Sequence, residues 1–379
     1  MKAVILIDSF KGSMSSVCAG NAVKRGIQKV YPDCDAIVMP LADGGEGTVD
    51  ALVEGLNGVY RTVTVSDPLL RPVTAKYGIV YGDTAVIEMS SASGITLITD
   101  SERNPLNTTT FGVGEMIKDA VLYGCRKFII GIGGSATNDG GLGMLTALGY
   151  KFFDKDGNSV GVDGKSLENI NSIDVSGALE ELKQCEFKIA CDVENPLCGE
   201  NGCSAVYGPQ KGATPEMVKL MDGWLSNFAS VTKRALNVDN VNVAGVGAAG
   251  GLGYALKTYL NANLQSGISL ILSSINAEEQ IKTADYVITG EGRLDSQSAM
   301  GKAPVGVSAL AKKYDKTVIA FSGCIGVGAE KLNYKGIDAF FPILQTVVPL
   351  ETAMNESVAK TNLEKTAEQT FRLIKSIKN

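Results

Sequence analysis

Charged side chains and glycines gather in four short loops, each of which follows a predicted buried strand: residues 8–13, 43–48, 131–139 and 290–302. Lys11, Arg293 and Lys302 supply cations, and the glycines let backbone N–H groups wrap an anion. Carboxylates in these loops and after a fifth strand supply ligands for Mg²⁺ or a base: Asp8, Asp43, Asp139, Asp192, Glu291 and Asp295. Each acid alone also fits a structural role in a cap or a turn. Together the loops suit phosphoryl transfer, which requires positioning and charge neutralisation.

Histidine is absent from the 379 residues, which excludes Ser-His-Asp and Cys-His nucleophiles and histidine metal sites. The formal net charge of -6 argues against nucleic-acid binding, because that function requires clustered lysine and arginine. With 45% apolar and 20% charged residues, the composition is that of a soluble globular protein able to bury large cores.

The eight cysteines form no Cys-x-x-Cys pair, so a structural zinc site is not expected. The apolar run at the N-terminus is too short for a signal peptide. No apolar run reaches the length of about 18 residues that marks a membrane-spanning helix. We therefore expect a cytoplasmic protein with reduced thiols and no membrane partner.

Two glycine-rich segments match the dinucleotide-binding fingerprint, which makes an NAD(P)-dependent oxidoreductase acting on a small hydroxy acid the alternative function. Residues 131–136 fit G-x-G-x-x-A after a predicted strand, and residues 245–250 fit G-x-G-x-x-G. The first segment lacks an immediate helix, and the second lacks a strand-ending acid about 20 residues later. Asp154 does end a strand after the first segment, which keeps this alternative open. A Walker A motif is absent, because Lys302 is followed by Ala303 and position 296 is Ser296.

Apolar periodicity predicts repeated strand–loop–helix units at both ends of the chain. Strands are expected at 3–7 and 36–39, and again at 286–289, 318–321 and 339–343, with helices between them. A helix near 304–313 begins just after the polar loop at 290–302, and a last helix carries residues 363–374. This alternation is typical of a doubly wound parallel sheet.

The middle of the chain has a different pattern. Residues 73–81 and 85–89 predict an antiparallel hairpin, followed by a helix near 113–122 and strands at 128–130 and 187–190. A long helix with an apolar stripe from Met217 to Val231 indicates core packing. We predict an α/β fold in which residues 1–67 and 276–379 form one parallel-sheet domain and residues 68–275 form an inserted mixed α/β domain.

Two similar glycine-rich segments, at 140–145 and 250–255, each follow a short β-like run and open a helix. They fit a pair of anion-binding cradles that face one ligand. They fit equally well two tight turns at which a helix packs closely against a strand.

At these same loops the sequence closely resembles the two-domain bacterial glycerate kinase family. The resemblance rests on six segments in the family's order that extend over essentially the whole chain: DSFKGS at 8–13, PLADGGEGT at 40–48, GIGGSATNDGG at 131–141, ACDVENPLCG at 190–199, YGPQKGA at 207–213 and TGEGRLDSQSAMGKAP at 289–304. It implies ATP- and Mg²⁺-dependent phosphorylation of D-glycerate, with 2-phosphoglycerate favoured over 3-phosphoglycerate. It also implies a Rossmann-like or flavodoxin-like domain made from both chain ends, an inserted α/β domain, and an active site in the cleft between them.

On this resemblance we assign roles to the loop residues as hypotheses. Asp192 is the first choice for catalytic base or metal ligand and Asp43 is the second, with Glu291 as a further metal ligand. Glycerate or the transferring phosphoryl group is predicted to contact Asp8, Ser9, Lys11, Arg293, Asp295 and Lys302, of which Lys11 and Arg293 are also catalytic. Nucleotide phosphates are predicted to contact Gly133, Gly134, Ser135, Asn138, Asp139, Gly247, Gly250 and Gly251. The oligomeric state, monomer or homodimer, stays open.

Overall fold

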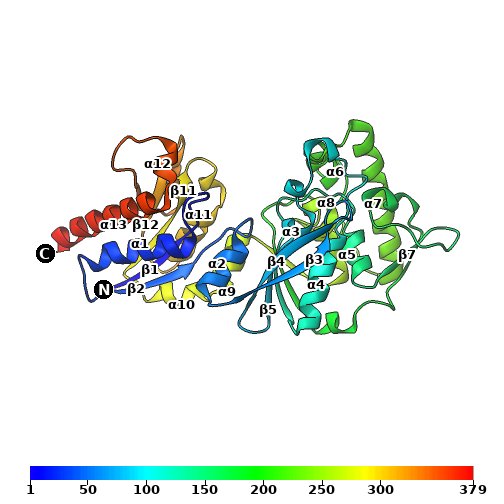
Figure 1. Ribbon diagram of the computed structural model, residues 1–379, viewed down its shortest axis with the longest axis horizontal. Helices are drawn as coiled ribbons and strands as arrows, with labels where there is room; N and C mark the ends of the chain where they lie inside the picture. The colour runs from blue at the N-terminus through cyan, green and yellow to red at the C-terminus, as the bar shows by residue number, and fades with distance from the viewer. Residues whose placement is uncertain (379) are drawn as a thin grey trace. The chain divides into compact units, whose positions relative to one another are not determined.

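The computed structural model describes residues 1–378, which divide into two compact units (Figure 1). Unit 1 contains Met1–Asp43, Asp50–Asn57 and the chain from Ile268 onward. Unit 2 contains Gly44–Val49 and Gly58–Gly267. Unit 1 is therefore built from both ends of the chain, and unit 2 is mainly one long insertion.

Unit 1 is organised on a five-stranded sheet in the order β13-β12-β11-β1-β2. The strands are β1 (Lys2–Ile7), β2 (Asp35–Pro40), β11 (Tyr286–Leu294), β12 (Thr317–Ile325) and β13 (Ala339–Pro342). Every neighbouring pair is parallel, and the central strand β1 pairs with β2 on one side and β11 on the other. This arrangement confirms the predicted parallel sheet, whose buried strands read as continuous apolar runs.

Helices cover the sheet of unit 1. Helix α1 (Ser16–Gln28) begins where the Ser15 hydroxyl accepts a hydrogen bond from the Cys18 N–H, and it packs along α13 (Glu356–Lys378). Apolar residues of these two helices form one core with Ala3, Ile5 and Ile7 of β1. The remaining helices are α2 (Thr48–Gly55), α9 (Gly267–Ser274), α10 (Ala277–Lys282), α11 (Ala303–Lys312) and α12 (Leu350–Met354).

Unit 2 contains a six-stranded sheet in the order β10-β9-β6-β5-β4-β3. Its strands are β3 (Val59–Ser66), β4 (Pro72–Val80), β5 (Thr84–Glu88), β6 (Lys127–Gly131), β9 (Glu186–Ala190) and β10 (Asn263–Gln265). β3, β4 and β5 pair antiparallel, which confirms the predicted hairpin, and the other pairs are parallel. A separate antiparallel pair joins β7 (Lys151–Phe153) and β8 (Ser172–Asp174).

The helices of unit 2 are α3 (Ser90–Ser93), α4 (Phe111–Tyr123), α5 (Leu142–Ala147), α6 (Cys203–Tyr207), α7 (Pro215–Leu236) and α8 (Ala248–Tyr259). Helix α7 begins at a Thr214 cap with Pro215 in its first turn and ends at Asn237 in the left-handed conformation. Of the predicted stripe, Met221, Phe228 and Val231 are buried in the core, whereas Met217 and Trp224 are half-buried.

The unit boundaries differ from the predicted 67 and 276. Residues 58–67 belong to unit 2 because β3, which the sequence pattern did not predict, pairs along its whole length with β4. Residues 268–275 belong to unit 1 as most of α9. Strand β11 also runs five residues further than predicted, because positions 290–294 continue the parallel pairing with β12.

The two similar glycine-rich segments pack against each other. The Gly140 N–H donates to the Gly250 carbonyl oxygen at 2.9 Å, and a Cβ on Gly251 would lie 2.9 Å from the Gly140 Cα. All four leading glycines, at 140, 141, 250 and 251, have positive φ. Each segment is a buried tight turn, and the two segments of the chain cross closely there. They therefore fit the second interpretation of the sequence, tight turns with close packing, and not the pair of anion-binding cradles.

Two further features bear on the environment of the protein. All eight cysteines are free thiols. Among residues 1–378, no helix combines the length and the apolar character needed to cross a lipid bilayer.

The crossing of the two glycine turns yields a stability prediction. Gly250→Ala should lower the free energy of unfolding by about 2–3 kcal/mol, because φ is +66° and the new Cβ would lie 2.1 Å from the Thr137 carbonyl oxygen. Gly157→Ala is the matched control, since φ is +84° there but nothing lies within 4 Å, and it should cost only about 1 kcal/mol. Equal shifts of the calorimetric transition temperature for both variants would contradict close packing at the crossing of the two glycine turns.

Candidate functional site

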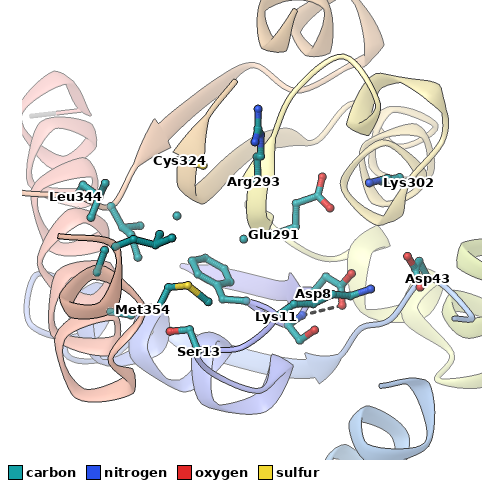
Figure 2. A pocket seen from close by; sticks show the side chains of 18 residues that line it. Asp8, Lys11, Ser13, Asp43, Glu291, Arg293, Lys302, Cys324, Leu344 and Met354 are labelled. Carbon is teal, nitrogen blue, oxygen red and sulfur yellow. Dashed lines mark hydrogen bonds between the residues drawn. The ribbon is translucent and has the colours of Figure 1, made fainter. Parts of the chain in front are cut away.

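A cavity of about 370 Å³ opens in unit 1 at the carboxyl ends of the parallel strands, where ligands bind in open α/β sheets (Figure 2). The cavity is lined by the loop after β1, by Asp43 after β2 and by the end of β11. Its ionisable lining residues are Asp8, Lys11, Asp43, Glu291, Arg293 and Lys302. The structure thus gathers six of the predicted substrate, catalytic and metal residues in one place, and Ser9 lines the same cavity.

Asp8 is the buried acid of this cavity. The chain is held here by the Asp8 N–H, which donates to the Gly290 carbonyl oxygen at 2.9 Å, and the Ser9 N–H donates to Asp8 Oδ1 at 2.7 Å. Burial and the negative charges of Asp43 and Glu291 raise the pKa of Asp8 to about 7, although the Ser9 hydrogen bond and Lys11 oppose this rise. A carboxyl group with such a pKa can gain and lose a proton near neutral pH.

Glu291 and its neighbours complete the charged part of the site. The Glu291 side chain is buried and accepts a hydrogen bond from the Ser298 hydroxyl, and burial raises the pKa of this carboxyl group. Arg293 is largely exposed, with its Nε 3.1 Å from Asp295 Oδ2. Asp295 also accepts a hydrogen bond from the Gln297 N–H at 2.9 Å, so it braces the turn that follows β11. It is not among the described residues that line the cavity.

The opposite end of the cavity is apolar, which the sequence did not predict. Phe10 and Ile343 are buried there, whereas Leu344, Leu350 and Met354 are exposed at 40%, 74% and 37%. In Figure 2, Leu344 and Met354 lie at one end of the cavity, and Asp43 and Lys302 lie at the other. No pattern in the sequence marks these residues, because β13 and the short α12 bring them together only in the folded chain.

The glycine-rich loop at 131–139 in unit 2 has a small exposed part. Within this fully described loop, Gly133 and Gly134 are exposed, and Gly134 has a φ of +73°. Asn138 and Asp139 are completely buried. Asp139 accepts hydrogen bonds from the N–H groups of Thr110, Gly141 and Gly143 and from the Thr110 hydroxyl, which identifies it as a structural anchor.

The second glycine-rich region is also buried. A Cβ on Gly247 would lie 2.2 Å from the Pro196 carbonyl oxygen, and Gly250 and Gly251 hold the crossing of the two turns. The tight packing explains these glycines without a ligand. A direct contact between a phosphate and this region would require the turns to separate.

Lys211 is a buried cation beneath the 131–139 loop that was not among the predicted site residues. Its Nζ donates to Ser135 Oγ and to the Thr137 carbonyl oxygen, both at 2.7 Å. Burial lowers the pKa of this amine to about 8, although Cys203 and Asp139 act in the opposite direction. Lys211 lies in the segment 207–213, which is one of the six that resemble the family. That resemblance is the sequence feature that could have identified it as a site residue.

Asp192 follows β9 in unit 2, and its Oδ1 accepts a hydrogen bond from the Gly267 N–H at 2.9 Å. Among the residues that the structure describes, no three His, Cys, Asp or Glu side chains are grouped so as to hold a metal ion. Magnesium commonly uses only one or two carboxylates, with waters and substrate phosphates as its other ligands. The assignment of Asp192 and Glu291 as metal ligands stays a prediction.

Neither glycine-rich segment has the surroundings of a dinucleotide-binding turn. Residues 131–136 follow β6, but the next helix, α5, begins only at Leu142. Residues 245–250 precede the main part of α8, but no strand lies between α7 and this segment. The strand–turn–helix unit that the fingerprint requires is missing in both places, and the oxidoreductase alternative finds no support.

Comparisons with known proteins agree with one another. A family model described as the glycerate kinase family matches residues 3–375. The chain is 47% identical to glycerate 2-kinase of Escherichia coli strain K12 over 354 aligned residues, and this alignment covers 93% of each protein. It is 46% identical over 379 residues to glycerate kinase of Bacillus subtilis strain 168, which covers 100% of this chain and 99% of that one. The crystal structure of a glycerate kinase 2 candidate from Salmonella typhimurium LT2 has a TM-score of 0.92 and is 44% identical in sequence. The match covers 100% of this chain and 99% of that one.

The raised pKa of Asp8 predicts a pH-dependent stability difference. The native state holds the Asp8 proton up to about pH 7, whereas an unfolded aspartate releases it near 3.8, so the stability due to this proton is lost as pH rises through that window. Asp8→Asn lacks this loss. The free energy of unfolding of the variant, relative to that of the wild type, should therefore increase by roughly 1–4 kcal/mol as pH rises from 4 to 8.

Urea unfolding of both proteins across this pH range measures the difference. Asp33→Asn, at an exposed position of the same unit, is the control for replacing an aspartate by asparagine. A difference for Asp8→Asn that changes no more with pH than that of the control would contradict the raised pKa.

Proposed function

The chain belongs to the glycerate kinase family, and from this premise we propose that it transfers the γ-phosphoryl group of ATP to the 2-hydroxyl group of D-glycerate. The observation that carries the proposal is the cavity of unit 1, in which Lys11, Arg293 and Lys302 lie around a group of carboxylates. Both substrates are anions, so cations are needed to hold them and to neutralise the phosphoryl group during transfer.

The proposed roles follow the chemistry of each side chain. Lys11, Arg293 and Lys302 bind the glycerate carboxylate and the transferring phosphoryl group. The exposed turn at Gly133 and Gly134 contacts nucleotide phosphates, with Ser135, Asn138, Asp139, Gly247, Gly250 and Gly251 supporting that turn from the interior. Glu291 or Asp192 would hold Mg²⁺ together with phosphate oxygens, and the ion would neutralise part of the phosphate charge.

The transfer needs a group that accepts the hydroxyl proton of glycerate. The oxygen of that hydroxyl attacks the γ-phosphorus, the bond between the γ-phosphorus and the bridging oxygen to the β-phosphate breaks, and ADP leaves. Asp192 and Asp43 were the bases predicted from the sequence. Support for Asp8 as a third candidate comes from its burial in the cavity and from its pKa of about 7.

The free thiols of all eight cysteines support a reducing compartment, and we propose that the reaction takes place in the cytoplasm.

Product analysis by ³¹P NMR tests the proposed reaction. With ATP, Mg²⁺ and D-glycerate, the γ-phosphate resonance of ATP should be replaced by one phosphomonoester resonance that coincides with added 2-phosphoglycerate. The same mixture without D-glycerate is the control and should form no phosphomonoester. A resonance that coincides with 3-phosphoglycerate would contradict the regiochemistry. Reduction of added NAD(P)⁺ by D-glycerate without formation of ADP would contradict the function.

Variants of the three acids test which one is the base. Asn replacements at Asp8, Asp43 and Asp192 should identify it by a loss of kcat of about 10²–10⁴, the usual contribution of general acid–base catalysis. If Asp8 is the base, wild-type kcat should rise with pH through about 7, and the residual activity of Asp8→Asn should lack this rise. A wild-type inflection that persists in Asp8→Asn, with a large loss in Asp192→Asn, would assign the role to Asp192 instead.

A further inference from the structure

The cavity of unit 1 is larger than glycerate requires and is chemically divided. Glycerate has seven heavy atoms, a carboxylate and two hydroxyl groups, and it offers almost no apolar surface. Pockets of about 300–1,000 Å³ are typical of ligands of drug size, and this cavity has about 370 Å³. The charged end alone suits glycerate and phosphate, which leaves the apolar end without a matching part of that substrate.

The apolar end has a buried floor and an exposed rim. Phe10, Ile343 and Ala359 form the floor and are at most 4% exposed, whereas Leu344, Leu350 and Met354 stand at the rim and leave much of their apolar surface in water. Isolated exposed apolar residues are common, but these three line one cavity. A flat apolar group placed here would cover the rim and contact the floor.

One polar atom at this end is also left without a partner. The Ser13 hydroxyl is buried and finds no hydrogen-bond partner among the described residues. Ser13 and Met354 both line the cavity, and Figure 2 labels both side chains. A buried hydroxyl without a partner costs free energy, so a ligand with a polar edge would stabilise this end.

The loop that carries Ser13 has a defined shape. The Phe10 N–H donates to the Met14 carbonyl oxygen at 2.9 Å, and the Ser13 N–H donates to the Phe10 carbonyl oxygen at 2.7 Å. A Cβ on Gly12, which has a φ of +75°, would lie 2.8 Å from the Met354 Cε. The loop therefore packs against α12 with Phe10 and Ser13 turned to the same cavity.

We propose that the apolar end of this cavity binds the adenine base of ATP, with the Ser13 hydroxyl bonded to the polar edge of the ring or to the ribose. Of the two substrates in the proposed function, on which this inference rests, only the nucleotide joins an anionic chain to a flat apolar body with polar edges. The triphosphate then extends toward Lys11, Arg293 and Lys302, where glycerate also binds. The base is thus assigned to unit 1 and not to the glycine-rich turns of unit 2.

Binding measurements with two probes test the assignment. Leu344→Asn should weaken Mg-ATP binding about tenfold, because one rim side chain no longer covers the base. Binding of Mg-tripolyphosphate, which has the phosphates without the base, should change less than twofold. Leu373→Asn, an exposed leucine on α13 in the same unit, is the matched control and should change neither. Calorimetric titration measures the six affinities of the wild type and the two variants for the two probes, after circular dichroism has shown that the variants are folded.

A second measurement locates the base directly. Photolabelling of the wild type by 8-azido-ATP should mark peptides that contain residues 343–354 or 10–14. Labelling confined to unit 2 would overturn the assignment. So would an equal loss of affinity for Mg-ATP and for Mg-tripolyphosphate in Leu344→Asn. Glycerate-dependent release of ADP by the wild type is measured first, so that a failure of the proposed function is seen separately from a failure of the base assignment.

Discussion

The pairing of β1 with β11 is the contact on which the site of unit 1 depends. It joins residues that are more than 280 positions apart in the sequence, with Ala3 opposite Tyr286 and Ile7 opposite Gly290. The hydrogen bond from the Asp8 N–H to the Gly290 carbonyl oxygen extends this register beyond the strand. Because Asp8 and Glu291 each follow this point by one residue, the register places the two carboxyl groups at one edge of the sheet. The negative charge of Glu291 is one of the causes that raise the pKa of Asp8, and a pairing that apolar strands stabilise brings it there.

The carboxylates of the two units illustrate two ways of burying an acid. Asp139 is surrounded by four donors from the backbone and from Thr110, and its hydrogen bonds organise the crossing of the glycine turns. Asp8 has one backbone donor and two negatively charged neighbours. Hydrogen bonds to a carboxylate favour its charged form, whereas burial and like charges disfavour it. Burial raises the pKa of both acids, but only Asp139 has four donors that oppose the rise. Its environment is therefore suited to structure, and that of Asp8 to proton transfer or to a bound cation.

The sequence predicted the parallel sheet, the hairpin and the polar loops, because each has a local signature in apolar period or in glycine and charge. It did not predict β3, since half of its side chains are polar and its identity depends on the partner strand β4. It also assigned Asn138, Asp139, Gly250 and Gly251 to ligand contact. Burial of these residues depends on the crossing of two segments more than 100 positions apart, which no local pattern reveals. The apolar end of the cavity was not predicted for the same reason, because Phe10, Leu344 and Met354 come together only through tertiary packing.

The insertion of unit 2 has a consequence for the order in which the protein is made. Strand β1 leaves the ribosome among the first residues, yet its neighbour β11 follows only after unit 2 has been synthesised. At a synthesis rate of about 5–20 residues per second, the N-terminal strands wait roughly 15–60 s for that partner. During this interval β1 and β2 expose an apolar edge, whereas most of unit 2 is already present to fold as one body. Nascent chains of this protein therefore have a long period in which a chaperone, or another unpaired strand, can bind β1 before β11 does.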